Sequence, residues 1–348
     1  MKLLVVGDSY MPVEVFRRAF ERLGDDHDFD YFQLDMRQTD IGDSDSERRI
    51  SEFAGSPRQI SERLSDHDAL VVHGGAVTDA VLDAAPGLRL VCCARGGPVN
   101  IDVEAATERG IPVATTPGKN AEAVADLTIA FLVILARGVM RAAGFLSGGG
   151  RVGESTFEGA EWFGHDLGGH LLGLIGYGQV GRRVALRALA MGMAVASFDP
   201  FVAPAAMAAD GVRPVSFGEL LAEARFVSLH ARQPATGPDL FGEAEFARMR
   251  AGSFFVNTAR ETLVDEEALF AALSSGHLAG AALDVLRPRA AGEVNPLLGL
   301  AGVVATPHIG GATFETLDRG ATMVAEEIER FAAGSALVNV INPAVLIR

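Results

Sequence analysis

The sequence has 348 residues, enough for two domains, and its 49% hydrophobic and 22% charged residues are the balance of an ordinary globular protein. Thirty basic residues against 45 acidic ones give a formal net charge of −15 without a basic cluster, which argues against nucleic acid as a partner. The apolar run at the start ends at Gly7, too early for a signal peptide or a membrane span. We therefore expect a cytoplasmic protein with no membrane attachment.

The first third of the chain alternates short β-rich runs with helical patterns. We expect strands at 3–6, 29–34, 69–72, 88–94 and 111–114, and helices at 13–23 and 60–64. This alternation is typical of a parallel sheet with helices on both faces, so we predict a flavodoxin-like domain. Cys92 and Cys93 are adjacent in one strand, and we interpret them as core residues rather than a disulfide or metal ligands. No metal site is predicted.

A second series of elements begins with a long apolar helix at 121–137. Strands are expected at 172–175, 194–198, 226–229, 254–257, 280–283 and 303–305, and six strands in succession fit a complete Rossmann unit. A last helix near 313–331 is expected to cross back to the first domain. The prediction is an α/β protein in which a Rossmann domain at 113–317 is inserted into a domain made of 1–112 and 318–348.

The segment 144–153 reads GFLSGGGRVG and lies between the expected helix at 121–137 and the expected strand at 172–175. Several glycines that each cost about 1 kcal/mol in a helix make helical structure unfavourable there. We expect an exposed loop or an arm that reaches a partner subunit.

A glycine-rich turn directly follows the strand at 172–175. Residues 176–181 read GYGQVG, which places Gly176, Gly178 and Gly181 at the glycine positions of G-x-G-x-x-G ahead of a helical pattern. In that context the glycines permit a tight turn, close approach of a pyrophosphate and close packing of the helix, whose N-terminus binds the phosphates. Asp199 ends the next strand, where it would accept hydrogen bonds from ribose hydroxyls and repel a 2′-phosphate. We predict NAD rather than NADP.

Three later strands each end in polar residues. They continue as VNTAR at 256–260, LDV at 283–285 and TPHIGGAT at 306–313. Because ligands bind at the carboxyl edge of doubly wound sheets, these segments are expected to converge on one crevice.

Together these motifs resemble the D-isomer-specific 2-hydroxyacid dehydrogenase family, which includes the phosphoglycerate dehydrogenase and glyoxylate reductase types. The resemblance extends over essentially the whole length and rests on GYGQVG, Asp199, Leu229-His230, VNTAR, LDV and TPHIGGAT. It implies NAD in the central domain, a 2-hydroxy or 2-keto acid bound by the outer domain, and a homodimer built around the central domains.

The resemblance also implies residue roles. Arg260 would hold the substrate carboxylate and polarise its keto oxygen, and His308 would take the hydroxyl proton as hydride leaves for the nicotinamide. Taken alone, His308 would more often be a capping or packing residue and Arg260 part of a surface ion pair, so both roles depend on the full set of motifs. The substrate is expected at His73, Gly74, Gly75, Ala76, Gly97 and Arg289, and the cofactor at Thr128, Gly176, Tyr177, Gly178, Gln179, Val180, Gly181, Asp199, His230, Thr258, Ala259, Asp284 and Gly310.

The chain departs from the family pattern at two positions. Arg289 stands five residues after Asp284, where the family has the glutamate that orients the catalytic histidine, and Glu261 stands where the family usually has glycine. Arg289 could pair with Glu261, could face a second anionic or hydroxyl-rich end of the substrate, or could be a plain surface arginine. His308 could then use Glu261 or Glu293 as another partner.

The leading hypothesis is an NAD-dependent 2-hydroxyacid dehydrogenase, or a keto-acid reductase in the reverse direction. The alternative is an NAD-binding regulatory or partner-binding module of the same fold, as in the corepressor relatives, with weak or lost catalysis. A formate dehydrogenase is a third option, which the arginine at 289 disfavours.

Overall fold

The computed structural model describes residues 1–151, 162–232 and 239–347. The chain forms two compact units, Met1–Lys119 with Thr313–Arg348, and Asn120–Ala312. The sequence-based boundaries at 112/113 and 317/318 thus differ by seven and five residues from these. The segment after residue 112 stays with the first unit because Thr115 N–H donates to the Asn339 carbonyl (2.8 Å) and Thr116 N–H donates to the Arg95 carbonyl (2.9 Å).

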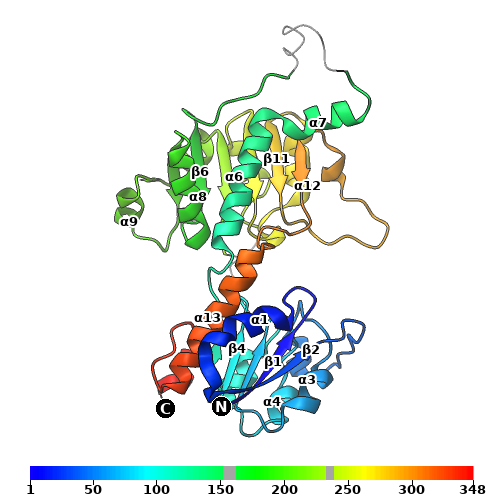
Figure 1. The fold of residues 1–348 in the computed structure, drawn as a ribbon. Helices are drawn as coiled ribbons and strands as arrows, with labels where there is room; N and C mark the ends of the chain where they lie inside the picture. The colour runs from blue at the N-terminus through cyan, green and yellow to red at the C-terminus, as the bar shows by residue number, and fades with distance from the viewer. Residues whose placement is uncertain (152–161, 233–238, 348) are drawn as a thin grey trace. The chain divides into compact units, whose positions relative to one another are not determined.

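The first unit contains a parallel sheet of five strands among the described residues (Figure 1). The strands are β1 Lys2–Gly7, β2 Asp28–Gln33, β3 Ala69–Val72, β4 Leu90–Cys93 and β5 Val113–Ala114. Their order, β2-β1-β3-β4-β5, is that of flavodoxin-like folds, which confirms the predicted fold. The helices are α1 Val13–Phe20, α2 Asp45–Arg48, α3 Pro57–Leu64, α4 Asp79–Asp83, α5 Val103–Glu108 and α13 Phe314–Ala332, with 3₁₀ turns η1 Glu21–Asp26 and η5 Pro343–Ile347.

Successive residues of the central strands face opposite helical layers. Val71 and Cys92 pack in a cluster with residues of α1 and α13, whereas Val72 and Cys93 pack in a cluster with residues of α3, α4 and α5. Strands buried on both faces carry continuous apolar runs rather than an alternating pattern. Cys92 and Cys93 are therefore buried free thiols of the core, which confirms their interpretation from the sequence.

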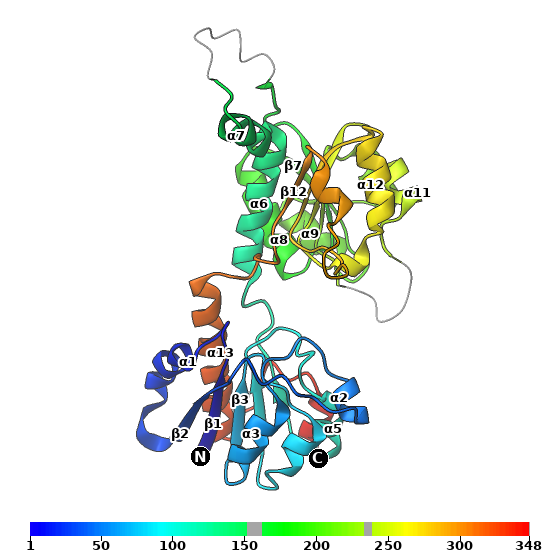
Figure 2. The same ribbon diagram turned by 90° about the vertical axis from the view of Figure 1, so that its right-hand side faces the viewer.

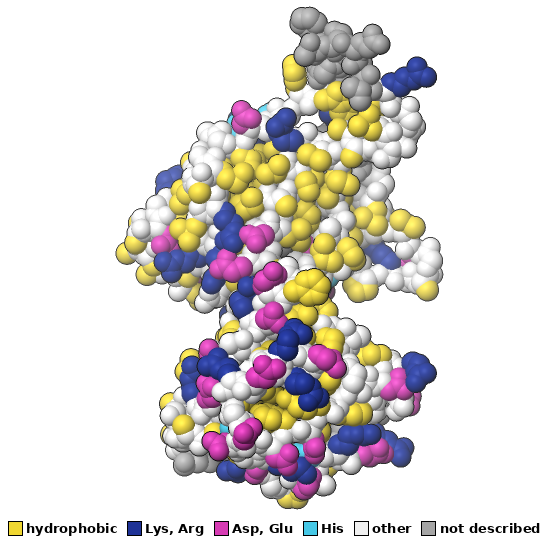
Figure 3. Space-filling model, in the orientation of Figure 1, with side chains coloured by type: hydrophobic (Ala, Val, Ile, Leu, Met, Phe, Trp, Pro, Cys, Tyr) yellow, Lys and Arg dark blue, Asp and Glu magenta, His cyan; other side chains and the backbone are white. Residues whose placement is uncertain are grey.

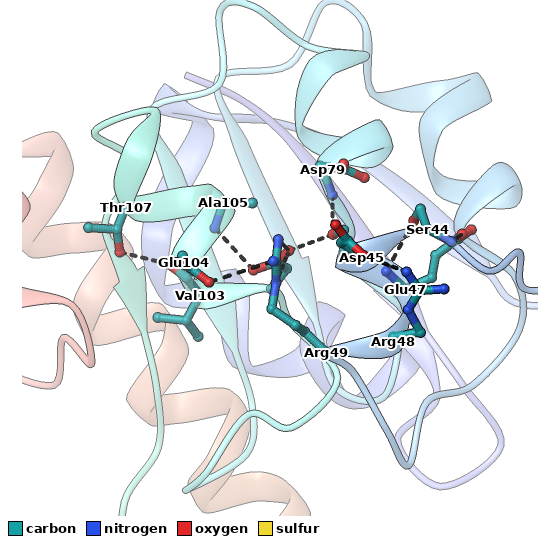
Figure 4. Close-up of polar contacts among 12 residues, drawn as sticks. Ser44, Asp45, Glu47, Arg48, Arg49, Asp79, Val103, Glu104, Ala105 and Thr107 are labelled. Atoms are coloured by element: carbon teal, nitrogen blue, oxygen red, sulfur yellow. Dashed lines mark hydrogen bonds and ion pairs between the residues drawn. The ribbon is translucent and has the colours of Figure 1, made fainter.

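One buried carboxylate, that of Asp102, joins two short helices of this unit, and Figure 4 labels two of its partners, Arg49 and Ala105. Asp102 caps α5 by accepting a hydrogen bond from Ala105 N–H (3.0 Å), and its other oxygen accepts from Ser46 Oγ (2.6 Å) and Arg49 Nη2 (2.7 Å). Burial alone would raise the pKa of Asp102, but the hydrogen bonds from Arg49 and Ser46 lower it below its ordinary value. The segment that contains α2 is thereby fixed to the start of α5.

The second unit contains a parallel sheet of seven strands among the described residues. They are β6 Leu171–Ile175, β7 Ala194–Phe198, β8 Arg213–Pro214, β9 Phe226–Leu229, β10 Ser253–Asn257, β11 Leu278–Leu283 and β12 Val303–Ala305. The order β12-β11-β10-β9-β6-β7-β8 is the Rossmann order extended by one strand. The sequence missed β8 because its two residues are both exposed and show no apolar pattern.

Helices cover both faces of this second sheet. They are α6 Ala121–Arg137, α7 Val139–Ser147, α8 Gln179–Ala190, α9 Pro204–Ala209, α10 Phe217–Glu223, α11 Glu243–Arg248 and α12 Glu266–Ser274, with 3₁₀ turns η3 Glu261–Leu263 and η4 Pro296–Gly299. Figure 2 shows α6 and α8 on one side of the strands and α11 and α12 on the other. Both faces of the sheet are thus covered, as its buried parallel strands require.

The expectation of no helix at 144–153 is wrong for the first part of that segment. α7 extends through Ser147, and Gly148 N–H donates to the Gly144 carbonyl (2.9 Å). One glycine within a helix costs only about 1 kcal/mol, which the better helix formers around Gly144 offset. Residues 152 and 153 lie outside the described part of the chain. No single helix in the described ranges is long and apolar enough to cross a membrane, and only α6 and α7 taken together, a pair bent by 68°, pass that test.

Candidate active site

The glycine-rich turn connects β6 to α8, as the sequence predicts. Gly176 has a φ of +94°, and a Cβ there would lie 2.7 Å from the carbonyl carbon of His230. A Cβ on Gly181 would lie 2.2 Å from the Gly176 oxygen, so both positions require glycine for the fold itself. A Cβ on Gly178 would meet nothing within 4 Å. The turn therefore leaves open space at the glycine that a bound pyrophosphate would approach, and these residues fit a dinucleotide.

Asp199 is held beside this turn. One carboxylate oxygen accepts a hydrogen bond from Tyr177 N–H (2.7 Å) and the other from Phe201 N–H (2.8 Å). Each oxygen keeps a second lone pair for a ribose hydroxyl. The Tyr177 side chain packs inward, where burial and its hydrogen bond to Asp210 raise its pKa. Tyr177 thus contributes its backbone to the turn and not its ring.

Two threonines predicted for the cofactor site lie side by side. Thr128 on α6 and Thr258 after β10 are buried, with their hydroxyl oxygens 3.1 Å apart, and the Thr128 hydroxyl also donates to the Val124 carbonyl (2.8 Å). His230 lies after β9, with Nε2 2.9 Å from the Ser228 hydroxyl, and burial lowers its pKa to about 3. His230 is therefore neutral near pH 7 and adds no charge to the edge of the sheet.

Asp284 organises the loop that carries His308. Its carboxylate, 2% exposed, accepts hydrogen bonds from the Thr306 hydroxyl (2.6 Å), Ile309 N–H (2.8 Å) and Gly310 N–H (2.7 Å). Its main-chain oxygen accepts from His308 N–H (2.9 Å). A Cβ at Gly310 would lie 2.7 Å from this carboxylate. The sequence predicted Asp284 and Gly310 as cofactor contacts, and the structure shows in addition that they support the histidine loop.

His308 has a φ of +56°, a left-handed conformation that is unfavourable for a residue other than glycine. The Asp284 contacts on both sides of it hold this conformation. The His308 side chain is exposed on its unit, as is that of Arg260. Strained residues held by a rigid surround are common at functional sites. The loop thus fixes the backbone conformation of His308 after β12.

Arg260 follows β10, and β10 and β12 are the two neighbours of β11. Asn257, buried at the end of β10, accepts a hydrogen bond from Ala259 N–H (2.9 Å) and donates one to the Arg260 carbonyl (3.0 Å). Sequence reasoning did not single out Asn257, although it lies within the VNTAR motif. Its amide fixes the turn that presents Arg260, whose guanidinium donates to the Ala259 carbonyl (2.7 Å). Arg260, Asp284 and His308 therefore follow three adjacent strands at one edge of the sheet.

Arg289 pairs with Glu266 rather than with Glu261, which corrects the hypothesised charge pair. The Arg289 guanidinium lies 2.7 Å from Glu266, a residue 6% exposed at the start of α12. Glu266 also accepts hydrogen bonds from Arg287 N–H (2.6 Å) and Asn295 Nδ2 (2.8 Å). A buried carboxylate requires such donors, and no pattern in the sequence indicates which loop residues supply them.

Glu261 lies on the wall of a small pocket beside this pair. The pocket is shallow, with a volume of about 10 Å³, and is lined by Asn257, Glu261, Val264, Glu266, Leu269, Leu283 and Val285. Glu261 and Glu266 therefore share a pocket at the ends of β10 and β11, although only Glu266 pairs with Arg289 in the described part of the chain.

The predicted substrate loops lie at the carboxyl edge of the first unit. His73 Nδ1 lies 2.9 Å from Asp8, and the ring of Tyr10 stacks on His73 with centroids 5.1 Å apart. Burial lowers the pKa of His73, and Asp8 only partly offsets this. Burial would raise the pKa of Asp8, but hydrogen bonds from His73 and from Met11 and Gly74 N–H keep it below its ordinary value.

The glycine positions of these loops differ in accessibility. Gly74 N–H donates to Asp8 (2.8 Å), so this donor is already used within the unit. Gly75 and Ala76 are buried, and the Gly75 carbonyl accepts from Asn100 Nδ2 (2.8 Å). Gly97 is exposed, and a Cβ there would meet nothing within 4 Å. Of these predicted positions, Gly97 is exposed, whereas Gly74, Gly75 and Ala76 are buried.

Comparison with known proteins agrees with this arrangement. Residues 129–310 match the family described as D-isomer specific 2-hydroxyacid dehydrogenase, NAD binding domain. The chain is 37% identical over 280 residues to a D-3-phosphoglycerate dehydrogenase of Mycobacterium tuberculosis, covering 80% of this chain and 52% of that protein. It is 38% identical over 292 residues to a glyoxylate reductase of Korarchaeum cryptofilum, covering 84% of this chain and 87% of the relative.

The chain spans about half the length of the phosphoglycerate dehydrogenases that it matches. Among solved structures, the TT0316 protein from Thermus thermophilus superposes with a TM-score of 0.76 at 33% identity, covering 98% of this chain and all of that one. Sequence motifs, two doubly wound sheets and relatives of this similarity lead to one assignment. The chain belongs to the D-isomer specific 2-hydroxyacid dehydrogenase family, and its second unit is the NAD-binding domain of that family.

Proposed function

We propose that this protein is an NAD-dependent oxidoreductase that interconverts a 2-hydroxy acid and the corresponding 2-keto acid. The observation that carries the proposal is the support of His308 by Asp284, which fixes a strained histidine two strands away from the turn that presents Arg260. In this proposal the second unit binds NAD and supplies the reacting groups. The first unit binds the substrate.

The residues divide the reaction between them. NAD, when bound, supplies the hydride acceptor for C2 of the hydroxy acid. Arg260 holds the substrate carboxylate through two parallel hydrogen bonds, a geometry that a guanidinium matches and an ammonium does not. His308 accepts the proton of the 2-hydroxyl as the carbonyl forms, and returns it during reduction. Asp284 does not touch substrate in this scheme and keeps the imidazole in position.

The surroundings of His308 depart from the pattern that the family resemblance implies. The position expected to hold an orienting glutamate is Arg289, whose charge is directed to Glu266. The imidazolium that forms during oxidation therefore lacks a carboxylate from this position. We propose that orientation of His308 depends on the main-chain support from Asp284, since correct placement supplies much of the rate in hydride transfer.

We also propose a homodimer. Hydrophobic side chains gather on the face of the second unit over α6 and α8 in Figure 3. α7 has no buried side chain within the described chain, and Val139, Met140, Phe145 and Leu146 are exposed on it. An apolar surface of this kind is typical of a subunit interface. Sedimentation velocity would test the assembly.

The test of the proposed activity is NADH oxidation with a panel of 2-keto acids, measured beside thermal-shift titrations with NAD. We expect turnover of at least one keto acid, with Arg260→Lys and His308→Gln lowering kcat/KM while NAD still raises Tm. NAD binding without turnover of any acid would reject the proposed activity and favour the regulatory module instead.

A further inference from the structure

Lys119 carries a buried ammonium group that has no partner. The residue is 8% exposed, and its Nζ makes no hydrogen bond within the described residues. The sequence contains only two lysines, Lys2 and Lys119, against 28 arginines among its 30 basic residues. Burial of an unpaired cation costs several kcal/mol. A chain that otherwise uses arginine thus places one of its two lysines where a cation is costly.

Backbone hydrogen bonds and a glycine of α13 define the position of this lysine. Its N–H donates to the Thr116 carbonyl (3.3 Å), and its carbonyl accepts from Arg319 Nε on α13 (2.8 Å). A Cβ on Gly320 would lie 3.0 Å from Lys119 Cδ and 3.5 Å from Nζ, so α13 has a glycine where the lysine side chain passes. Lys119 therefore has a defined position in the fold and is not a loosely held end of the unit.

No neighbouring charge within the described chain neutralises it. Asp8 interacts with the Lys119 charge favourably, but the Asp8 carboxylate is occupied by His73 and by the N–H groups of Tyr10, Met11 and Gly74. Burial raises the pKa of the Cys93 thiol to about 11, so that thiol is neutral. Arg95 adds a like charge and pairs with Glu52. Burial, more than Arg95, lowers the pKa of Lys119 to about 8.

A second unpartnered group belongs to the same turn. The hydroxyl of Thr116, the residue whose carbonyl receives the Lys119 N–H, is buried without a hydrogen-bond partner in the described chain. Both residues follow β5 at the carboxyl edge of the sheet, the edge at which open α/β sheets bind ligands. Asp8 and His73 follow β1 and β3, the two strands at which the strand order reverses.

We infer that Lys119 is a specificity-determining residue that binds an anionic oxygen group of the substrate, a carboxylate or a phosphate, other than the carboxylate held by Arg260. This inference rests on the proposed function and deepens it: the substrate is a 2-hydroxy acid that carries a second anionic group. A bound oxyanion supplies the missing counter-charge and accepts the unused N–H donors of the ammonium. A shorter monocarboxylate leaves the ammonium unpaired.

Direct binding tests the inference without reference to turnover. Malonate and inorganic phosphate are titrated by calorimetry at pH 7, where Lys119 is charged, into the 348-residue chain and its Lys119→Met and Lys2→Met variants. Lys2 is the matched control because it is the other lysine and pairs with Asp66 at the surface. We expect at least one probe to bind, Lys119→Met to weaken it at least tenfold, and Lys2→Met to leave it unchanged.

A structural role for Lys119 predicts a different result. Replacing an unpaired buried cation by an apolar side chain of similar length should leave the Tm of the ligand-free protein unchanged or higher. If Lys119→Met lowers Tm and leaves the dissociation constants unchanged, the lysine is structural and the inference is overturned. Failure of both probes to bind the parent protein overturns it as well.

Kinetics separate this inference from the proposed function. The ratio of kcat/KM for oxaloacetate or a phosphorylated 2-keto acid to that for glyoxylate should fall at least tenfold in Lys119→Met. If anions bind in a way that depends on Lys119 but no keto acid is turned over, the proposed activity is rejected and the anion site is retained. If keto acids are turned over and the ratio of kcat/KM values is unchanged in Lys119→Met, the proposed activity is retained and the anion site is rejected. The preferred probe, malonate or phosphate, identifies the second group as carboxylate or phosphate.

Discussion

The main-chain oxygen of Asp284 accepts the N–H of His308 at 2.9 Å, while the Asp284 carboxylate binds residues on either side of that histidine. A single buried residue, Asp284, thus sets the backbone conformation of the proposed acid/base residue. Asp284→Asn should replace one acceptor oxygen by an N–H₂ group that faces the Gly310 or Ile309 donor. We expect kcat/KM to fall at least tenfold and the free energy of unfolding to drop by about 2 kcal/mol.

Steady-state kinetics and urea denaturation would measure both effects. Thr306→Val is the matched control, because it removes one of the three donors and leaves the carboxylate in place. Its effect should be smaller on both measures. Equal activity of Asp284→Asn and the parent would show that His308 does not depend on this support.

Two glycines of the dinucleotide turn, Gly181 and Gly178, can be tested as a pair for a role in folding and a role in cofactor binding. Gly181→Ala brings a Cβ to within 2.2 Å of the Gly176 oxygen, so it should lower Tm even without cofactor. Gly178→Ala meets nothing in the described chain, so Tm should stay near that of the parent while NAD affinity falls at least tenfold. Thermal shift with and without NAD separates the two. Unchanged NAD affinity in Gly178→Ala would argue against a pyrophosphate at this turn.

Asp199 should determine the choice between NAD and NADP. Asp199→Ala removes the carboxylate that would repel a 2′-phosphate, and a second change of Pro200→Arg adds a cation for it. We expect the ratio of NAD to NADP dissociation constants to shift at least tenfold toward NADP in the double variant. Because Asp199 also accepts Tyr177 N–H, Asp199→Asn is the control that keeps an acceptor there. An unchanged ratio in all three variants would place the ribose elsewhere.

Arg260→Lys retains the positive charge and loses the planar fork. If Arg260 holds the substrate carboxylate, kcat/KM for a 2-keto acid should fall at least tenfold, about 1.4 kcal/mol of transition-state stabilisation. Arg250, an exposed arginine before β10, serves as the control for the same substitution. A fully active Arg260→Lys protein would show that the carboxylate binds another group.

Arg289 offers a choice between a structural pair and a substrate contact. Arg289→Gln should destabilise the protein by about 1 kcal/mol, and a double-mutant cycle with Glu266→Gln should show coupling of at least about 0.5 kcal/mol. The same cycle with Glu261→Gln should show none. A narrowed or widened range of accepted keto acids in Arg289→Gln would identify a substrate contact, whereas an unchanged range would remove Arg289 from the substrate site.

Much of the fold follows from local sequence patterns. The strand at 69–72 and the helix at 121–137 match the observed bounds because their apolar residues and flanking turn residues are unambiguous. The exposed strand β8 and the helix α7 were missed because neither buries an apolar face in its own unit. An element that packs against its own unit shows apolar residues at the spacing of a helix or a strand. These two elements do not pack in this way, so their sequences lack that pattern.

The site shows the same division between local and long-range information. The G-x-G-x-x-G turn is a local signal, and the chain forms it where the sequence predicts. The partner of Arg289 is not local, because Glu266 lies 23 residues earlier, whereas the sequence alone suggested Glu261. Only the packing of α12 against the loop after β11 decides between them. Lys119 belongs to no motif that the sequence analysis recognised. The lack of a hydrogen-bond partner for its ammonium group is visible only in the structure.

The insertion of one unit into the other has a consequence for synthesis on the ribosome. Val113 N–H in β5 donates to Asn342 Oδ1 (2.8 Å), and Ile328 of α13 belongs to the same core cluster as Phe16 of α1. The first unit therefore needs contacts from residues translated more than 200 positions later. The second unit is continuous in sequence and emerges complete before them. We expect the second unit to fold first on the ribosome. Until the C-terminal residues are made, the edge strand and the apolar helical surface of the first unit stay exposed to solvent and prone to aggregation. A chaperone would shorten this period.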